Sequence, residues 1–246
     1  MEKAKIIISL IVIIAVVLIF GYSINKDKNV YTTSGNKTSS TSSSNNEAKD
    51  NDETEENVEY LTGKHYIEIK VKNYGTMQLE LDADIAPITV TNFINLVNEK
   101  FYDGLTFHRI IEGFMVQGGD PEGTGFGGSE NKIKGEFLAN GIKNSISHKR
   151  GVISMARSSA SYNSASSQFF IVHEDSQESL DGLYAAFGHV TSGIEVIDKL
   201  VKVKVEDDNG TVLPENQPKI EYIKVIKKMQ NSTHLYMRRS KLVILY

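Results

Sequence analysis

The residue of this chain best suited to chemistry is Arg109, which lies inside the largely apolar run FHRIIEGFMVQGGD of residues 107–120. Buried arginine is rare unless its charge is paired or used. Only five of the 27 basic residues are arginines. An arginine in this run therefore indicates a need for a fixed, permanently charged donor. Cysteine nucleophiles, thiolate metal sites and disulfides are excluded, because the chain has no cysteine.

The same run predicts a β-hairpin that carries Arg109. Glu112 and Gly113 fit the two central positions of a tight turn. In the register that such a turn sets, Arg109 and Gln117 lie on opposite faces of the hairpin. A site that uses both side chains then requires a bulge or a strand end near Met115, which the following glycine pair could supply.

A second run, SSQFFIV at residues 166–172, predicts a strand with two different faces. Gln168 and Phe170 lie on one face, and Phe169 and Ile171 lie on the other. If this strand lies beside the hairpin, the two form an apolar floor edged by an arginine and two amides. Spacing alone leaves open the alternative of a core patch whose arginine meets an internal carboxylate.

The elements around these runs are mostly short strands bounded by Gly, Ser or Asn. Apolar spacings of three and four predict a helix that begins at Pro87, and Ser192 and Glu195 have the spacing of a capping box before a second helix. The predicted elements are strands at 65–71 and 76–82, a helix from 87 to about 101, strands within 151–155, 168–172 and 185–190, a helix near 194–201 and a strand at 220–226. This order favours one mainly β, antiparallel barrel with helices over its open ends.

Three segments flank the predicted domain, which is expected at residues 63–229. Residues 1–22 hold an apolar stretch after two lysines and predict a retained signal anchor or a cleaved signal peptide, with a core helix as the remaining alternative. Residues 23–62 are polar and acidic and predict a disordered linker. The tail at 230–246 predicts a frayed end, or an added membrane or partner contact.

Four motifs, in their order and spacing, give the chain a family resemblance. They are the run at 107–120, GVISMA at 151–156, SQFFI at 167–171 and LDGLYAAFG at 180–188. Together they resemble the cyclophilin-type peptidyl-prolyl cis-trans isomerases, with a bacterial-like sequence, over about residues 64–228. The resemblance implies a closed eight-stranded antiparallel barrel capped by two α-helices. An apolar N-terminal helix and a disordered linker are expected in front of it.

The resemblance also implies a groove for a proline-containing peptide. It makes Arg109 the catalytic arginine and Gln117 the residue that positions Arg109 and the substrate. The other implied groove residues are Phe114, Met115, Phe170 and Leu180 around the proline, and His108, Ala156, Gln168 and Tyr184 elsewhere.

At four positions the chain departs from common members of the resembled family. Ser179 stands where many eukaryotic members have the tryptophan associated with tight cyclosporin binding, which puts drug sensitivity in doubt. Tyr184 replaces a histidine, as in bacterial members. Arg157 and Ser158 occupy an Asn-Ala pair of the groove. We expect this last change to alter the contacts that flank the proline.

Other signals give no cofactor, metal or nucleic-acid site. GTGFGG at residues 123–128 matches a dinucleotide fingerprint but lacks the amphipathic helix that should follow it. The six histidines have no metal-ligand spacing, so neither a metal nor a cofactor is expected. A formal net charge of -4 argues against nucleic-acid binding.

The sequence therefore favours a monomeric isomerase that binds proline-containing polypeptides and is tethered to the cell membrane by its N-terminal helix. Its catalytic domain is expected outside the cytoplasm, as a single-pass protein or, after signal cleavage, as a secreted one. Its substrates would be exported proteins, whose folding can wait tens of seconds on proline bonds. One alternative is a binding module or chaperone for Pro-containing segments that needs no turnover, and another is a cytosolic isomerase.

Overall fold

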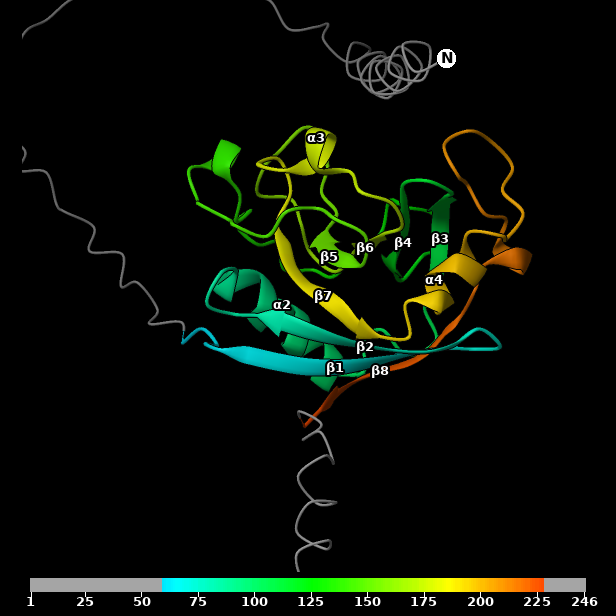
Figure 1. Ribbon diagram of the computed structural model, residues 1–246, viewed down its shortest axis with the longest axis horizontal. Coiled ribbons are helices and arrows are strands. Elements are labelled where there is room, and N and C mark those ends of the chain that lie inside the picture. Colours follow the sequence, from blue (N-terminus) through cyan, green and yellow to red (C-terminus); the bar gives the residue numbers. More distant parts are fainter. Residues whose placement is uncertain (1–58, 228–246) are drawn as a thin grey trace, which may run out of the picture. The chain divides into compact units, whose positions relative to one another are not determined.

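The computed structural model describes residues 59–227, and their strands form one antiparallel sheet that curls around an apolar core (Figure 1). The order of strands across the sheet is β3-β4-β6-β5-β7-β2-β1-β8. The strands are β1 (Lys64–Val71), β2 (Gly75–Asp82), β3 (Thr106–Ile111), β4 (Met115–Asp120), β5 (Val152–Met155), β6 (Phe169–Val172), β7 (Ala186–Ser192) and β8 (Ile220–Ile226). The helices are α2 (Pro87–Asn98), α3 (Gln177–Leu180) and α4 (Glu195–Leu200), with 3₁₀ turns at Leu138–Asn140 and Pro214–Asn216.

Strands β1 and β2 form the hairpin that alternation predicts. Their inward-facing side chains are fully buried, whereas their neighbours in the chain are partly exposed. Lys72, Asn73 and Tyr74 connect the two strands, and Asn73 adopts a positive φ of 69°. Asparagine tolerates this left-handed conformation better than most residues, so the turn has the residue type that it needs.

Helix α2 packs against β2 and β8 and places Val90, Phe93 and Val97 in the core. Ala86 precedes it and provides no side-chain cap. The buried carboxylate of Glu136 instead accepts the backbone N–H groups of Ile88 and Thr89 at 3.0 and 2.8 Å. A distant loop therefore satisfies the first N–H groups of the helix, where a negative charge also complements the helix dipole.

Aromatic rings fill the space between α2 and the sheet. Phe93 stacks on Tyr102 with ring centroids 5.0 Å apart and meets Phe169 edge-on at 5.6 Å. The phenol of Tyr102, although fully buried, donates to the carbonyl oxygen of Ser167 at 3.0 Å. This contact ties the core to the segment that leads into β6.

The two edge strands of the curled sheet approach each other at one end. Ile220 N–H donates to the Leu105 carbonyl oxygen at 2.7 Å, and Gly104 N–H donates to the Ile220 carbonyl oxygen at 2.8 Å. Thr106 also forms a bridge to Lys219, and Phe107 N–H donates to the Pro218 carbonyl oxygen at 2.9 Å, but within residues 59–227 β3 and β8 form no ladder. Full closure of the barrel stays a prediction.

Three expectations about local structure need correction. Ser192 does not cap the second helix, because it ends β7 while Ile194 is the residue before α4. The short helix α3 was not expected, so the described domain has more than two helices. Leu61 was placed in the linker, yet its N–H donates to Thr91 and its side chain packs on the core.

The predicted anchor at 1–22, most of the linker at 23–62 and the tail at 230–246 lie outside the described residues. Among residues 59–227, no helix has the length and apolar character needed to cross a membrane.

Candidate active site

Arg109 and Gln117 face each other directly across the β3–β4 hairpin. Ile111 pairs with Met115, so three residues rather than two connect the strands. The extra residue shifts the register by one and brings Arg109 opposite Gln117. Glu112 and Gly113 are the central residues of the turn, as predicted, because Phe114 N–H donates to the Ile111 carbonyl oxygen at 3.1 Å. The predicted register was wrong, because Phe114 belongs to the connection and β4 begins only at Met115, which is the strand end that a site with both side chains requires.

The hairpin is irregular at its other end. His108 on β3 has no partner on β4, because Phe107 pairs with Gly118 and Arg109 with Gln117. Gly119 is the corresponding extra residue on β4 and has a φ of 84°. Each bulge adds one residue to its strand, so the alternation of side chains between the two faces shifts by one residue just beyond Arg109.

The guanidinium group of Arg109 is held from three sides. Its Nε donates to the Asn209 carbonyl oxygen at 2.8 Å, its Nη2 to Asn209 Oδ1 at 3.0 Å and its Nη1 to Gln117 Oε1 at 3.3 Å. Burial lowers the pKa of Arg109, while the groups of Tyr184 and Asp207 oppose that shift. Arginine remains protonated in proteins, so the structure fixes a cation at this point.

Asn209 belongs to a loop whose position depends on tight hydrogen bonds. Asp207 accepts from Thr211 N–H at 3.0 Å and from the Thr211 hydroxyl at 2.9 Å. Ile110 N–H then joins this loop to β3 by donating to the Gly210 carbonyl oxygen at 2.8 Å. Sequence reasoning missed Asn209, because nothing in the local pattern links this loop to a strand 100 residues earlier.

A chain of amides continues from Arg109 along the site. Gln117 Nε2 donates to Gln168 Oε1 at 2.8 Å. Gln168 Nε2 in turn donates to the carbonyl oxygens of Gly125 and Gly127 at 3.0 and 2.7 Å. The oxygen of Gln117 is thereby directed toward Arg109, since its NH₂ group is taken by Gln168.

Beside this chain, the outer face of the sheet carries a second apolar cluster, separate from the main core. Gln117 pairs with Phe170 on β6, and Phe170 pairs with Ser154 on β5, so the polar and apolar parts share one face. Predicted groove residues form much of this cluster: Met115, Phe170 and Leu180 are buried, and Phe114, Ala156 and Tyr184 pack against them partly exposed. All six expected apolar groove residues are thus brought together.

The glycine-rich loop at 123–128 is filled by the protein's own carboxylate. Asp120 accepts backbone N–H groups from Glu122, Thr124 and Gly125 at 2.8, 3.0 and 2.5 Å. These bonds, together with others from the backbone, lower the pKa of Asp120 against the opposing effect of its burial. A phosphate would need the same N–H groups, so the loop buttresses Gln168 instead of binding a dinucleotide.

The residues that form this fixed cation, the two amides and the apolar cluster lie within a segment that matches a known protein family. The sequence model described as cyclophilin type peptidyl-prolyl cis-trans isomerase/CLD matches residues 66–225. The chain belongs to the cyclophilin-type peptidyl-prolyl cis-trans isomerases.

Two bacterial peptidyl-prolyl cis-trans isomerases and one solved structure show the closeness of the match. Peptidyl-prolyl cis-trans isomerase B of Bacillus subtilis is 46% identical over 139 residues, which cover 56% of this chain and 87% of that protein. An isomerase of Helicobacter pylori is 46% identical over 144 residues, covering 58% and 83% of the two chains. A Cryptosporidium parvum cyclophilin solved in the presence of the dipeptide Ala-Pro superposes with a TM-score of 0.59 and 29% identity, covering 66% of this chain and 99% of its own.

His108, one of the expected groove residues of this cyclophilin, is only 5% exposed. Neither ring nitrogen has a hydrogen-bond partner among the described residues. Gln168 lies nearby, but its amide is already bonded to Gln117 and the glycine loop. Burial lowers the pKa of His108, and the nearby Asp120 charge only partly opposes this effect.

A Ser–His–Asp chain lies beside Phe170 in this cyclophilin. His148 Nδ1 lies 2.7 Å from Asp181 Oδ1, and His148 Nε2 lies 3.0 Å from the Ser154 hydroxyl. Ser154 is fully buried beside its β6 partner Phe170, which stacks on the His148 ring with ring centroids 6.1 Å apart. No substrate can reach this hydroxyl, so the chain does not act as a hydrolytic triad and instead holds the His148 ring against Phe170.

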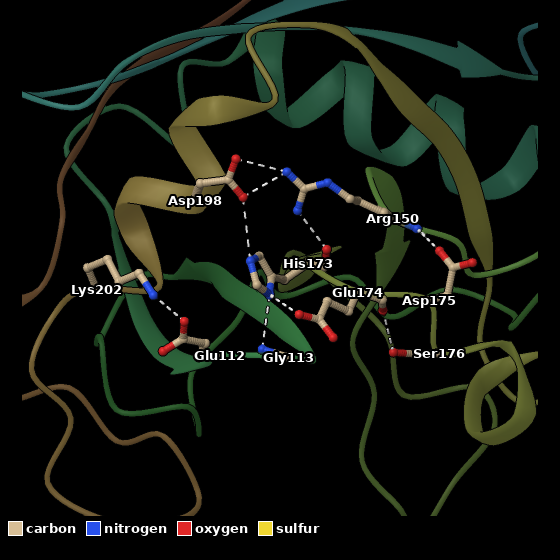
Figure 2. Close-up of polar contacts among 9 residues, drawn as sticks. All are labelled: Glu112, Gly113, Arg150, His173, Glu174, Asp175, Ser176, Asp198 and Lys202. Atoms are coloured by element: carbon tan, nitrogen blue, oxygen red, sulfur yellow. Dashed lines mark hydrogen bonds and ion pairs between the residues drawn. The ribbon is translucent and has the colours of Figure 1, made fainter.

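Figure 2 shows the network that holds the turn bearing Phe114. The ring nitrogen Nδ1 of His173 accepts a hydrogen bond from the backbone N–H of Gly113 at 2.9 Å. The backbone N–H of His173 donates to the Phe114 carbonyl oxygen at 2.8 Å. Arg150 bonds to the His173 carbonyl oxygen at 2.8 Å and to both carboxylate oxygens of Asp198 on α4. The turn is thus tied to β6 and, through Arg150, to α4.

Proposed function

We propose that Arg109 catalyses rotation about X-Pro bonds by donating a hydrogen bond to the prolyl nitrogen as the amide twists. Amide resonance makes the barrier to this rotation roughly 18–20 kcal/mol. At the twisted state the nitrogen lone pair leaves conjugation and becomes a good acceptor. A donor in that position favours the twisted form over the planar form, and it therefore raises the rate instead of merely tightening binding.

The observation that carries this proposal is the fixed guanidinium beside the outer apolar cluster. Asn209 and Gln117 take one hydrogen of each guanidinium nitrogen. An arginine has five N–H groups, so two remain on the Nη atoms for a substrate. Because the group is already oriented, little reorganisation is needed when the amide twists.

The proline ring would bind against Phe114, Met115, Phe170 and Leu180 while the preceding carbonyl rotates. Gln117 positions Arg109 and the substrate. Exclusion of water by the apolar cluster strengthens the arginine's hydrogen bond. The remaining groove positions are assigned to His108, Ala156, Gln168 and Tyr184, of which His108 is almost fully buried.

A protease-free isomerisation assay tests the proposal directly. Exchange NMR on a short X-Pro peptide should show faster cis-trans exchange at catalytic amounts of the chain. The alternative is a binding module or chaperone, for which the peptide resonances would shift on binding without faster exchange. That outcome would overturn the catalytic proposal.

We further propose that the domain acts on exported proteins, outside the cytoplasm, as a monomer with a closed barrel and an N-terminal membrane anchor. The apolar stretch after two lysines and the polar linker support this location. Added protease should remove the domain from intact cells, and membranes should retain the chain after salt washing. Release of a mature chain shorter by about the first 23 residues, seen by intact mass, would favour secretion instead.

A further inference from the structure

Arg157 is held in an aromatic cage at the border of the groove. Its guanidinium carbon lies 5.2 Å from the ring centroid of Phe137, 4.9 Å from that of Tyr162 and 4.7 Å from that of Tyr184. Cation–π attraction operates at these distances. The cage therefore restricts a side chain that would otherwise sample many rotamers.

Two hydrogen bonds complete the restraint and fix the orientation of the group. Arg157 Nε donates to the Leu183 carbonyl oxygen at 3.0 Å, and Nη1 donates to the Ser158 carbonyl oxygen at 3.1 Å. Of the five N–H groups of an arginine, three have no acceptor among the described residues. These three lie on the Nη atoms, the part of the group that can grip a carboxylate with two parallel bonds.

The charge of Arg157 has no counter-ion within the described part of the chain. Arg150, in contrast, donates from Nη2 to both carboxylate oxygens of Asp198, whereas no ion pair joins Arg157 to an Asp or Glu of residues 59–227. Arg157 is only partly exposed. A half-buried cation without an anion gains from an anion that a ligand brings.

The cage lies directly against the expected proline site. Tyr184 forms one wall of the cage and also meets Phe170 edge-on, with centroids 5.8 Å apart. Ala156, the residue before Arg157, packs on the outer apolar cluster. A peptide whose proline contacts Phe170 would therefore bring a neighbouring side chain close to Arg157.

We propose that Arg157 is a specificity-determining residue that selects substrates with an Asp or Glu side chain near the proline. The proposal rests on the proposed isomerase function and adds the class of sequence that the groove prefers. Among the chemical groups of an unmodified polypeptide, carboxylates match a guanidinium fork in both charge and shape. A partly exposed pair of this kind should favour the acid by about fivefold, and salt should reduce the preference.

The test uses the full-length chain and matched peptides that carry Glu or Gln at one position, from two residues before the proline to two after it. The readout is the ratio of kcat/KM for the Glu and Gln peptides, measured by exchange NMR. Wild type should prefer Glu by about fivefold at one position, and Arg157→Gln should bring that ratio to about one. Lys72→Gln changes the net charge equally, in the distant β1–β2 connection, and should leave the ratio unchanged.

The proposal is overturned if wild type turns over the Gln peptides but prefers Glu at no position, or if the preference survives in Arg157→Gln. If Arg157→Gln does not fold, Arg157→Lys gives a second measurement: it keeps the charge without the planar fork and should lower the ratio to about twofold, while an unchanged ratio contradicts the proposal. Absence of turnover with every peptide would instead count against the isomerase function itself.

Discussion

Arg109 is suited to catalysis because its neighbours fix its geometry without neutralising it. Its hydrogen bonds are accepted by the backbone carbonyl oxygen of Asn209 and by the side-chain amide oxygens of Asn209 and Gln117. None of these acceptors is a carboxylate. A carboxylate partner would compete with the substrate for the positive charge. Arg150, paired with Asp198, shows the structural use of the same residue type.

The first prediction concerns Asn209, which contributes two of these acceptors. Asn209→Ala removes the side-chain acceptor and loosens the loop that supplies the carbonyl oxygen. A hydrogen bond to a charged group contributes about 1.5–3 kcal/mol, so we expect kcat to fall by about tenfold with a smaller change in KM. Steady-state kinetics in a protease-free assay measures both.

The exposed Asn95→Ala on α2 is the matched control and should behave as wild type. Unchanged kcat in Asn209→Ala would show that Gln117 alone suffices to hold Arg109.

The second prediction concerns pH and the buried histidines. Burial lowers the pKa values of His108 and His148 in the folded state. Below the unfolded value of about 6.5, the unfolded chain therefore binds protons more readily than the folded chain. The free energy of unfolding should fall as pH drops from about 6.5 through the lower folded-state pKa values.

Urea denaturation at pH 7.5 and 5.5 measures this fall. His108→Leu removes one of the two groups, and because the ring nitrogens of His108 lack partners in the described domain, the change should cost little at pH 7.5. The variant should lose less stability on acidification than wild type. An equal or larger loss would show that His108 is not one of the groups responsible.

At the scale of elements, the site depends on the register of the β3–β4 hairpin. The three-residue connection sets Arg109 opposite Gln117, and bulges at His108 and Gly119 end that register. Two glycines with positive φ allow this path: Gly113 in the turn, at 83°, and Gly119 in the bulge, at 84°. Their surroundings differ, and this difference provides a test.

The third prediction compares Gly113→Ala with Gly119→Ala. A Cβ at Gly113 would meet only Glu174, at 4.0 Å, whereas one at Gly119 would lie 2.6 Å from the Ser167 carbonyl oxygen. Gly113→Ala should lower the free energy of unfolding by only about 1–2 kcal/mol, which is the cost of holding a residue with a Cβ in the left-handed conformation. Gly119→Ala should cost several kcal/mol in total, because backbone must also move.

Urea unfolding of the two variants at one pH gives the comparison. Equal losses of stability would contradict the bulge at Gly119.

The sequence predicted the elements better than it predicted their contacts. Alternation and spacing located β1, β2, α2 and β8, because burial on one face leaves a periodic pattern. The register after the Glu112-Gly113 turn was mispredicted, because Glu-Gly fits a two-residue connection as well as part of a longer one. Asn209 and the cage around Arg157 could not be predicted, because they join segments distant in sequence and leave no local pattern.

At the scale of the whole molecule, the curled sheet has apolar groups on both of its faces. The inner face packs on α2, while the outer face at β4, β5 and β6 carries the second cluster. An apolar cluster beside a fixed cation is the kind of surface that the proposed function requires for a proline ring. The family resemblance suggested the residues of this surface, and the register of the sheet explains why they meet.

The central claim is that Arg109 lowers the barrier to rotation and does not merely bind the peptide. The most direct test is exchange NMR on an X-Pro peptide with Arg109→Ala, combined with a titration that measures the peptide Kd. Loss of one preorganised donor should lower kcat by about 100-fold or more, while Kd changes by only a few-fold and the thermal melt stays near wild type. Turnover within a few-fold of wild type would contradict the claim, as would a loss of activity explained entirely by weaker peptide binding.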